Sequence, residues 1–331
     1  MRDRTLLVGS LTVLAAAAGF GILGPVARFA YEAGLEPFSF VAWRAAFGAL
    51  VVIIYAAWRI KRGRPVVAPW RLAGGDRAAL GVAALMALAL NVGMFFAFDR
   101  ATVALVLLGF YTYPALVAIV AVARGDEPLD AVRGAALALS LAGMVLVVAG
   151  GLDPGAGVRV DLLGIGLALF AAITQTVFIS VSRTGYRSMP TEQAMGWILA
   201  STAIASAILA LAVGAGSQLT LPLRSGDPLA LSVLAGVLAA GIPSLLFLTG
   251  IRTIGGTRTG ILMLFEPVVG VVLAAILLGE ALLPIQAIGG LAILGAALLL
   301  QRSGPGARAA ETAAAHEVPP SSPPIPRGAE R

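Results

Sequence analysis

The sequence predicts an all-α integral membrane protein whose ten transmembrane helices form two inverted five-helix repeats. Three observations predict this class. Hydrophobic residues make up 59% of the 331 residues and charged residues only 12%, whereas soluble domains hold about 25% charged residues. Ten apolar segments reach the roughly 20 residues that a helix needs to cross the hydrocarbon core. Related residues also recur in the two halves at a fixed spacing.

Taken in order, the predicted spans are 5–27, 38–58, 78–98, 101–123, 131–150, 161–182, 193–213, 229–251, 257–278 and 284–301. Gly, Pro and Asp residues of the kind that form turns separate them, as between Gly63 and Pro69. After Gln301 the chain becomes rich in Pro, Ala and Ser. Such a composition buries too little apolar surface to fold, so residues 303–331 are predicted to form a disordered cytoplasmic tail.

The cations follow the positive-inside rule. If the N-terminus is cytoplasmic, nearly all Arg and Lys residues lie on the inner side. The outer side then holds only Arg28, Arg100, Arg159 and Arg224. This asymmetry predicts that both termini are cytoplasmic, and it explains the basic charge without a nucleic-acid partner. The excess of Arg over Lys is typical of a GC-rich genome, so we expect the inner (plasma) membrane of a bacterium.

Missing residue types exclude most enzyme chemistry. The chain has no Cys, which excludes thiol catalysis and Cys-ligated metals. Its one His, His316, lies in the polar tail. No Gly-rich phosphate-binding loop precedes the one Lys, Lys61. We therefore expect a protein that is not an enzyme and holds no cofactor or metal.

An internal repeat relates the two halves. A shift of 153 residues places Tyr113-Pro114 on Glu266-Pro267 and Glu127 on Glu280. Each half, residues 9–149 and 160–301, then holds five spans. Because five is odd, the second copy crosses the membrane in the opposite orientation. Inverted repeats of this kind are typical of transporters.

The second half resembles the EamA family of the drug/metabolite transporter superfamily. The resemblance rests on the segments Phe265-Glu266-Pro267-Val268, Leu277-Leu278-Gly279-Glu280-Ala281-Leu282, Gln286-Ala287-Ile288-Gly289 and Leu294-Gly295. In the first half it rests on Trp43-Arg44 and on Tyr113-Pro114 leading to Glu127. The first half departs from the family in reading Asp126-Glu127-Pro128 where Gly-Glu is usual, and Gly19-Phe20-Gly21 replaces a frequent Trp-Gly pair. The resemblance implies a secondary transporter that exports small metabolites such as amino acids by alternating access.

Glu266 is the foremost candidate for a role in transport. A carboxylate midway along a span is expensive and normally faces a cavity or a partner. Pro267 leaves the carbonyl of Met263 free and favours a kink, so this position suits a substrate ammonium or a proton. Tyr113-Pro114 is the matching interruption in the first half, and such matched interruptions indicate a binding site at mid-depth. The alternative role of Glu266 is to pin two helices together.

Four further polar residues are candidates for the cavity. Asn91 and Ser244 occupy matching mid-span positions, with hydrogen bonding between helices as the alternative. Gln175 belongs to a polar patch in the sixth span. Arg44, the recurrent second-span arginine of the resemblance, would capture a carboxylate, pair with an acid or extend to the outer surface. Phe95, Phe96 and Tyr111 would stack on a substrate ring or pack in the core.

Two rival functions stay open. A carbohydrate or nucleotide-sugar transporter would need cations at mid-depth, and the sequence places none there. A non-transporting sensor or assembly factor would need larger loops. Expected partners are the lipid bilayer, a small-molecule substrate and protons. The Gly and Ala residues of the fifth and tenth spans suit close helix packing, including contact in a homodimer.

Overall fold

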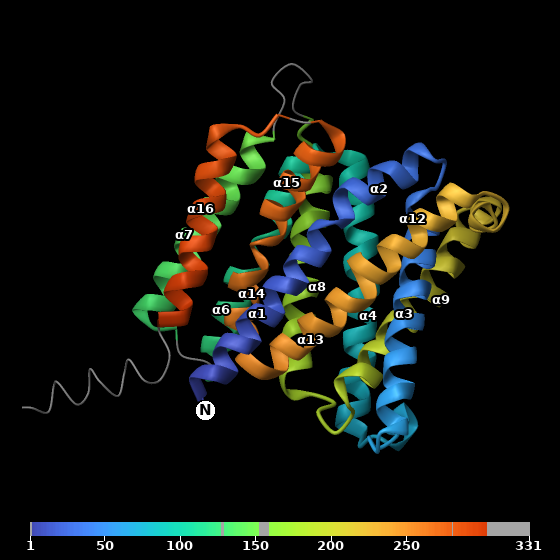
Figure 1. Cartoon of the computed structure of the whole chain (residues 1–331), viewed down its shortest axis with the longest axis horizontal. Helices are drawn as coiled ribbons and strands as arrows, with labels where there is room; N and C mark the ends of the chain where they lie inside the picture. Colours follow the sequence, from blue (N-terminus) through green and yellow to red (C-terminus); the bar gives the residue numbers. More distant parts are fainter. Residues whose placement is uncertain (1, 127–128, 152–158, 280, 303–331) are drawn as a thin grey trace, which may run out of the picture.

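The computed structural model describes residues 2–126, 129–151, 159–279 and 281–302, and all its regular elements in these ranges are helical (Figure 1). The predicted tail and both Glu127 and Glu280 lie outside the described residues. Nine described segments are long and apolar enough to cross a membrane, and the shorter apolar helix Pro284–Leu300 completes the ten predicted spans. The first span continues to Glu32, beyond the predicted end at residue 27.

Each of the ten spans is built from one helix or two. The spans of the first half are α1 with α2 (Arg2–Gly21, Leu23–Glu32), α3 (Pro37–Lys61), α4 (Gly74–Arg100), α5 with α6 (Val103–Phe110, Tyr113–Ala123) and α7 (Ala131–Gly150). Those of the second half are α8 (Leu162–Thr184), α9 (Thr191–Ala212), α12 with α13 (Gly226–Gly236, Ile242–Ile254), α14 with α15 (Gly256–Met263, Glu266–Leu278) and α16 (Pro284–Arg302). Short connecting helices are η1 (Pro69–Arg71), α10 (Gly216–Leu219) and α11 (Leu221–Arg224).

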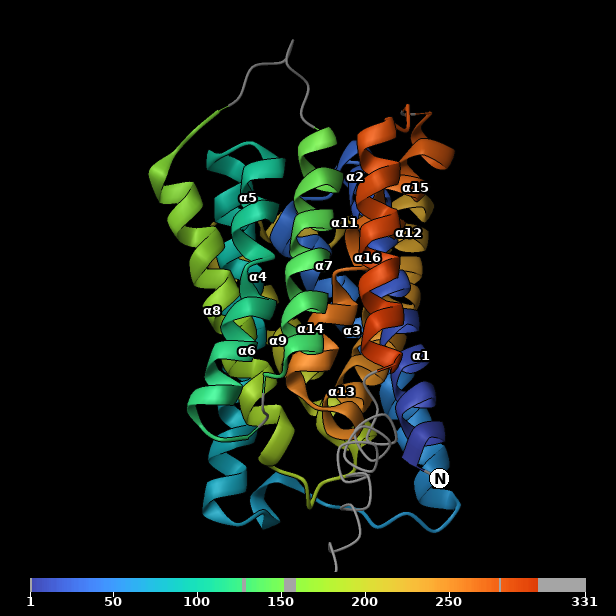
Figure 2. The same cartoon turned by 90° about the vertical axis from the view of Figure 1, so that its left-hand side faces the viewer.

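The two halves run in opposite directions through the bundle. We call the end at which α1 begins the near end, and the end at which α2 finishes the far end (Figure 1). Helix α6 finishes at the near end, whereas its counterpart α15 finishes at the far end (Figure 2). Helix α16 returns to the near end, where α1 begins. The ten spans therefore form two inverted five-helix repeats.

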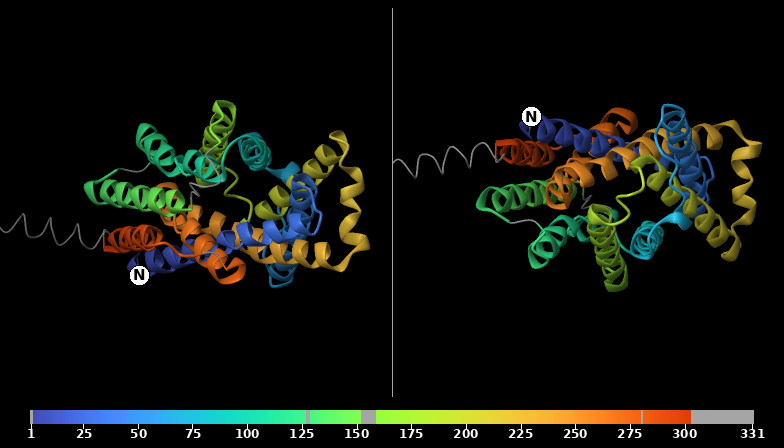
Figure 3. Two further views of the ribbon diagram at one scale, coloured as in Figure 1. Left: turned by 90° about the horizontal axis from the view of Figure 1, so that it is seen from above. Right: turned by 90° about the horizontal axis from the view of Figure 1, so that it is seen from below.

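Helices α7 and α16, the last spans of the two halves, pack side by side at one edge of the bundle (Figure 3). Gly143 and Gly289 meet at their crossing. A Cβ atom at Gly143 would lie 2.6 Å from the Gly289 carbonyl oxygen, and one at Gly289 would lie 2.5 Å from that of Gly143. The small residues predicted for these spans thus bring two helices of one chain together.

Two interruptions occur at equivalent places in the halves. The fourth span breaks at Tyr111 and Thr112, between α5 and α6, and the ninth breaks at Leu264 and Phe265, between α14 and α15. The two breaks are again 153 residues apart (264 − 111 = 153). Pro114 and Pro267 occupy the first turn of the helix that follows each break, where a missing N–H group is tolerated.

Two more interruptions face each other across the halves. The first span turns at Ile22, and the eighth contains a π-helical segment, η2 (Val237–Gly241). On the far side of both, a small apolar cluster is separate from the main core. Its buried members are Val26, Ala30, Leu35, Phe40 and Ala235. Helix α2, the start of α3 and helix α12 therefore form a corner with its own packing.

Candidate functional site

The interruptions of the fourth and ninth spans meet inside the bundle. A Cβ atom at Gly260 would lie 3.4 Å from Cα of Pro114 and 3.9 Å from the Tyr113 ring, so α14 and the start of α6 are in van der Waals contact. Glu266 is the first residue of α15 and Tyr113 the first of α6. The two pseudo-equivalent positions therefore lie at the junction of the repeats.

Charged and phenolic groups gather around Glu266. The Tyr111 side chain lies within hydrogen-bonding reach of the Glu266 carboxyl group, and Tyr113 interacts with the same carboxyl group electrostatically. Arg44 on α3 supplies the opposing positive charge. Tyr111 and Tyr113 are buried, while Glu266 and Arg44 stay half-buried although they lie midway through the bundle. Groups that are partly accessible at this depth can meet a ligand or water.

A hydrogen bond to Asn91 orients Arg44. The Arg44 Nη2 donates to Asn91 Oδ1 over 2.9 Å, and Asn91 Nδ2 donates to the Ala87 carbonyl over 2.8 Å. This arrangement turns the amide oxygen toward the guanidinium. The Arg44 Nε atom is buried and has no hydrogen-bond partner among the described residues. A donor without a partner is costly in a buried setting, so the position suits an anionic ligand group.

We expected no cation at mid-depth, but Arg44 comes within electrostatic reach of Glu266. The sequence could not reveal this, since a long side chain reaches several depths.

Tyr31 is a site residue that the sequence did not single out. It lies near the end of α2, its side chain is 39% exposed, and it interacts electrostatically with Arg44. A tyrosine at a span end is commonly an interfacial anchor, so its type gave no signal. Its ring packs edge-on against Phe40, with ring centroids 5.8 Å apart.

Ser244 and Gln175 are not joined to this group. Among the described residues, no hydrogen bond or charge interaction connects either side chain to Arg44 or Glu266. Both are half-buried, on α13 and α8. Phe96 packs on Phe38 with ring centroids 6.0 Å apart, and the side chain of Phe95 lies outside the described part.

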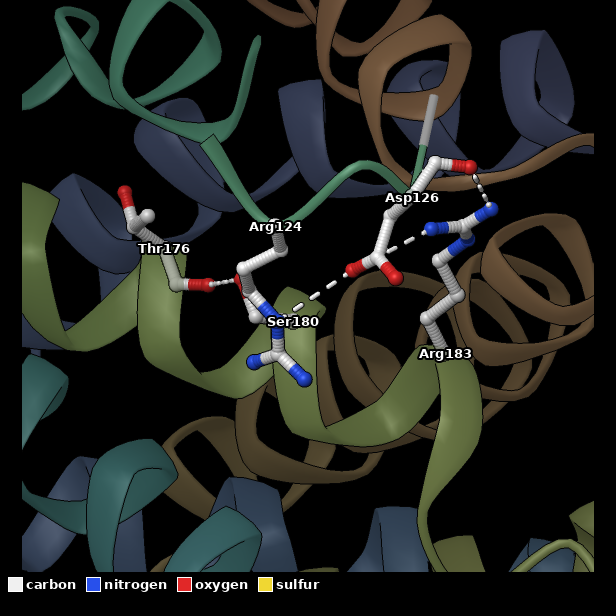
Figure 4. Close-up of polar contacts among 5 residues, drawn as sticks. All are labelled: Arg124, Asp126, Thr176, Ser180 and Arg183. Carbon is white, nitrogen blue, oxygen red and sulfur yellow. Dashed lines mark hydrogen bonds and ion pairs between the residues drawn. The ribbon is translucent and has the colours of Figure 1, made fainter. Parts of the chain in front are cut away.

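Polar contacts close the near end of the bundle around Asp126 (Figure 4). The Arg183 Nη1 atom on α8 lies 3.4 Å from Asp126 Oδ2, and Arg183 Nη2 donates to the Asp126 carbonyl over 2.9 Å. Arg124 approaches the same carboxylate at 3.3 Å. The cavity beside them, lined by Ser180, is only about 10 Å³. These contacts join the end of α6 to α8.

A second network at the near end surrounds Tyr186. The Tyr186 backbone N–H and the Ser188 hydroxyl both donate to Asp76, at 3.1 and 2.7 Å. Arg252 on α13 donates to the carbonyls of Tyr186 and Met189, at 3.1 and 3.0 Å, and its guanidinium lies over the Tyr186 ring. Tyr186 is fully buried with a φ of 42°, and burial raises the pKa of its hydroxyl.

A residue in this left-handed conformation persists only where its surroundings fix it. These contacts therefore hold the connection between α8 and α9 against α4 and α13. Among the described residues, no group of three or more His, Asp or Glu side chains could hold a metal ion.

Comparison with known proteins identifies related sequences and folds. The sequence model described as the EamA-like transporter family matches residues 7–149 and 162–302. A solved structure titled "Crystal structure of protein" superposes with a TM-score of 0.73 at 21% identity, covering 88% of this chain and 96% of that chain. At this identity the likeness concerns the fold alone. A search of curated proteins finds no match.

Proposed function

Because the chain belongs to the EamA-like transporter family and is thus a multi-pass membrane transporter, we propose that it exports small metabolites such as amino acids by alternating access. The membrane is the inner membrane of a bacterium, with the near end in the cytoplasm. One observation carries the proposal. The Glu266 carboxylate, at the break in the ninth span, lies within electrostatic reach of Arg44 on α3.

The charges of the site fit a zwitterion. The Glu266 carboxylate would receive an ammonium group, and the unpartnered Nε of Arg44 would donate to a carboxylate. The Phe110 ring centroid lies 5.3 Å from that of Tyr111 and 5.2 Å from that of Tyr113. These three rings would pack against the apolar part of the substrate.

Access to the site follows from the two ends of the bundle. The contacts of Asp126 and Tyr186 join helices at the near end, whereas the exposed Tyr31 on α2 lies within electrostatic reach of Arg44. We infer that substrate enters or leaves this conformation at the far end. Transport requires the near-end contacts to break while the far end closes.

The residue test is the substitution Glu266→Gln, which keeps the shape and removes the charge. We expect efflux of the responsive metabolite to fall at least tenfold in overexpressing cells, because about 1.4 kcal/mol of lost binding corresponds to a factor of ten. The matched control is Glu32→Gln, which removes an exposed carboxylate that pairs with Arg28. Equal efflux by the wild type and Glu266→Gln would refute the role of Glu266.

Proton coupling through Glu266 is the further part of the proposal. The carboxylate would exchange a proton for the substrate ammonium, since both compete for the same negative charge. Flux into proteoliposomes, measured with and without a pH gradient, tests this step. A rate that does not respond to the gradient would exclude proton coupling and leave facilitated diffusion.

A second candidate cargo is an anionic carbohydrate derivative such as a nucleotide sugar. It is favoured by Arg44, which brings a cation and an unpartnered donor to the site. Competition assays separate the two candidates. An amino acid requires both Arg44 and Glu266, whereas an anion would bind more tightly after Glu266→Gln because a repelling charge is gone.

A further inference from the structure

The end of α3, the connection that follows it and the first turn of α4 concentrate positive charge at the near end. Its exposed cations are Lys61, Arg62, Arg64, Arg71 and Arg77. None of these five makes an ion pair among the described residues. The nearest acid in the sequence, Asp76, already accepts hydrogen bonds from Tyr186 and Ser188. Other arginines at this end have partners, as Arg183 has in Asp126 and Arg252 in Tyr186. We call residues 61–77 the basic loop.

The basic loop has a fixed shape. The Gln193 side chain of α9 donates to the Pro65 carbonyl over 2.7 Å and accepts from the Val67 N–H over 2.9 Å. Leu72 is buried, and Trp70 packs edge-on against Trp197 with ring centroids 6.3 Å apart. The loop therefore presents its cations from a stable framework instead of a mobile chain.

Large apolar side chains accompany the cations. Trp70 is 68% exposed, Val66 63% and Trp58 46%, and the Arg62 guanidinium lies 4.3 Å above the Trp58 ring. Exposed tryptophan is unfavourable in bulk water but is typical of the boundary between lipid headgroups and acyl chains. Tryptophan beside unpaired cations suits a surface that is both apolar and negatively charged.

We propose that the basic loop binds the headgroups of anionic phospholipids. The lipid phosphates neutralise Arg62, Arg64 and Arg71, and the rings of Trp58 and Trp70 insert beside the acyl chains. Each cation near an anionic membrane strengthens binding about fivefold. This binding site is distinct from the transport site around Glu266, so the inference does not depend on the proposed substrate.

The test uses purified full-length protein in neutral detergent, titrated with brominated phosphatidylglycerol or brominated phosphatidylcholine. Bromine quenches nearby tryptophan fluorescence, and Trp58 and Trp70 lie within the basic loop or directly before it. We expect stronger quenching by phosphatidylglycerol. The triple substitution Arg62→Gln, Arg64→Gln and Arg71→Gln should weaken its binding about a hundredfold, three successive factors of about five.

Two further variants keep the result interpretable. The matched control replaces the exposed arginines Arg28, Arg100 and Arg224 of the far end by Gln, and should bind phosphatidylglycerol like the wild type. If the triple Gln variant fails to fold, replacement of the same three residues by Lys keeps the charge and should keep the binding.

Equal quenching by the two lipids, or unchanged binding by a folded triple Gln variant, would overturn the proposal. Competition by millimolar inorganic phosphate would also overturn it, since the loop would then be a site for free phosphate.

Discussion

Replacing Asp126 by Asn should loosen the near end of the bundle. The Asp126 carboxylate contacts Arg183 at 3.4 Å and Arg124 at 3.3 Å. The Asp126 and Arg183 side chains are 29% and 24% exposed, and that of Arg124 is 52% exposed. Solvent-screened pairs of this kind contribute about 0.2 to 1 kcal/mol each, and the more exposed Arg124 contributes least. The substitution should therefore destabilise the closed state relative to the open state by about 1 kcal/mol, which raises the population of the open state about fivefold.

Cysteine labelling measures this shift, because the chain has no Cys of its own. Ser180→Cys is nearly isosteric and places a thiol beside Asp126, where the cavity of about 10 Å³ does not admit a maleimide. We expect the thiol to react about fivefold faster in the Asp126→Asn background, as the open state becomes more populated.

The control is Asp161→Asn, at the other end of α8, where Asn also caps the helix. An unchanged labelling rate in Asp126→Asn would refute the assignment of Asp126 to the closure. An equal rise in Asp161→Asn would refute it too, since the effect would then come from general destabilisation.

Three further predictions concern stability. Gly48→Ala should destabilise the detergent-solubilised protein by about 1 to 3 kcal/mol, because its Cβ would lie 3.0 Å from a backbone nitrogen of η2. The control Gly81→Ala, where a Cβ would meet open space, should show no loss of stability in thermal unfolding. Gln193→Ala removes two hydrogen bonds to the basic loop, so trypsin should cut faster after Arg62, as followed by mass spectrometry. The raised pKa of Tyr186 favours its neutral hydroxyl in the folded state. The folded protein should therefore lose stability as the pH rises above about 10, where the tyrosine of the unfolded chain ionises. Thermal unfolding measured over this pH range should show a smaller loss for Tyr186→Phe.

The spans and the inverted repeat were predictable because a bilayer imposes simple requirements. Each crossing needs about 20 apolar residues, and Pro removes a backbone donor wherever it falls. The matched positions of Pro114 and Pro267 consequently predicted where helices are interrupted in both halves. An odd number of spans in each repeat determined the relative orientation of the halves.

The partners of the polar side chains were less predictable. In helices that are apolar on every side, periodicity does not tell which face points inward, so the sequence did not identify Asn91 as the partner of Arg44. Side-chain length added uncertainty, because Arg44 could extend to the surface or to Glu266. The network around Tyr186 was not predicted either, since it joins Asp76 and Arg252, which are far apart in the sequence.

The separate packing of α2 with α12 has a consequence for local movements within the bundle. The corner contains its own buried residues, Val26, Ala30 and Phe40 among them, and it connects to the rest of α1 and α13 through Ile22 and η2. Tilting this corner would disturb the bends in its two connecting helices and leave most of the main apolar interior intact. We therefore expect α2 and α12 to move together when this corner opens locally.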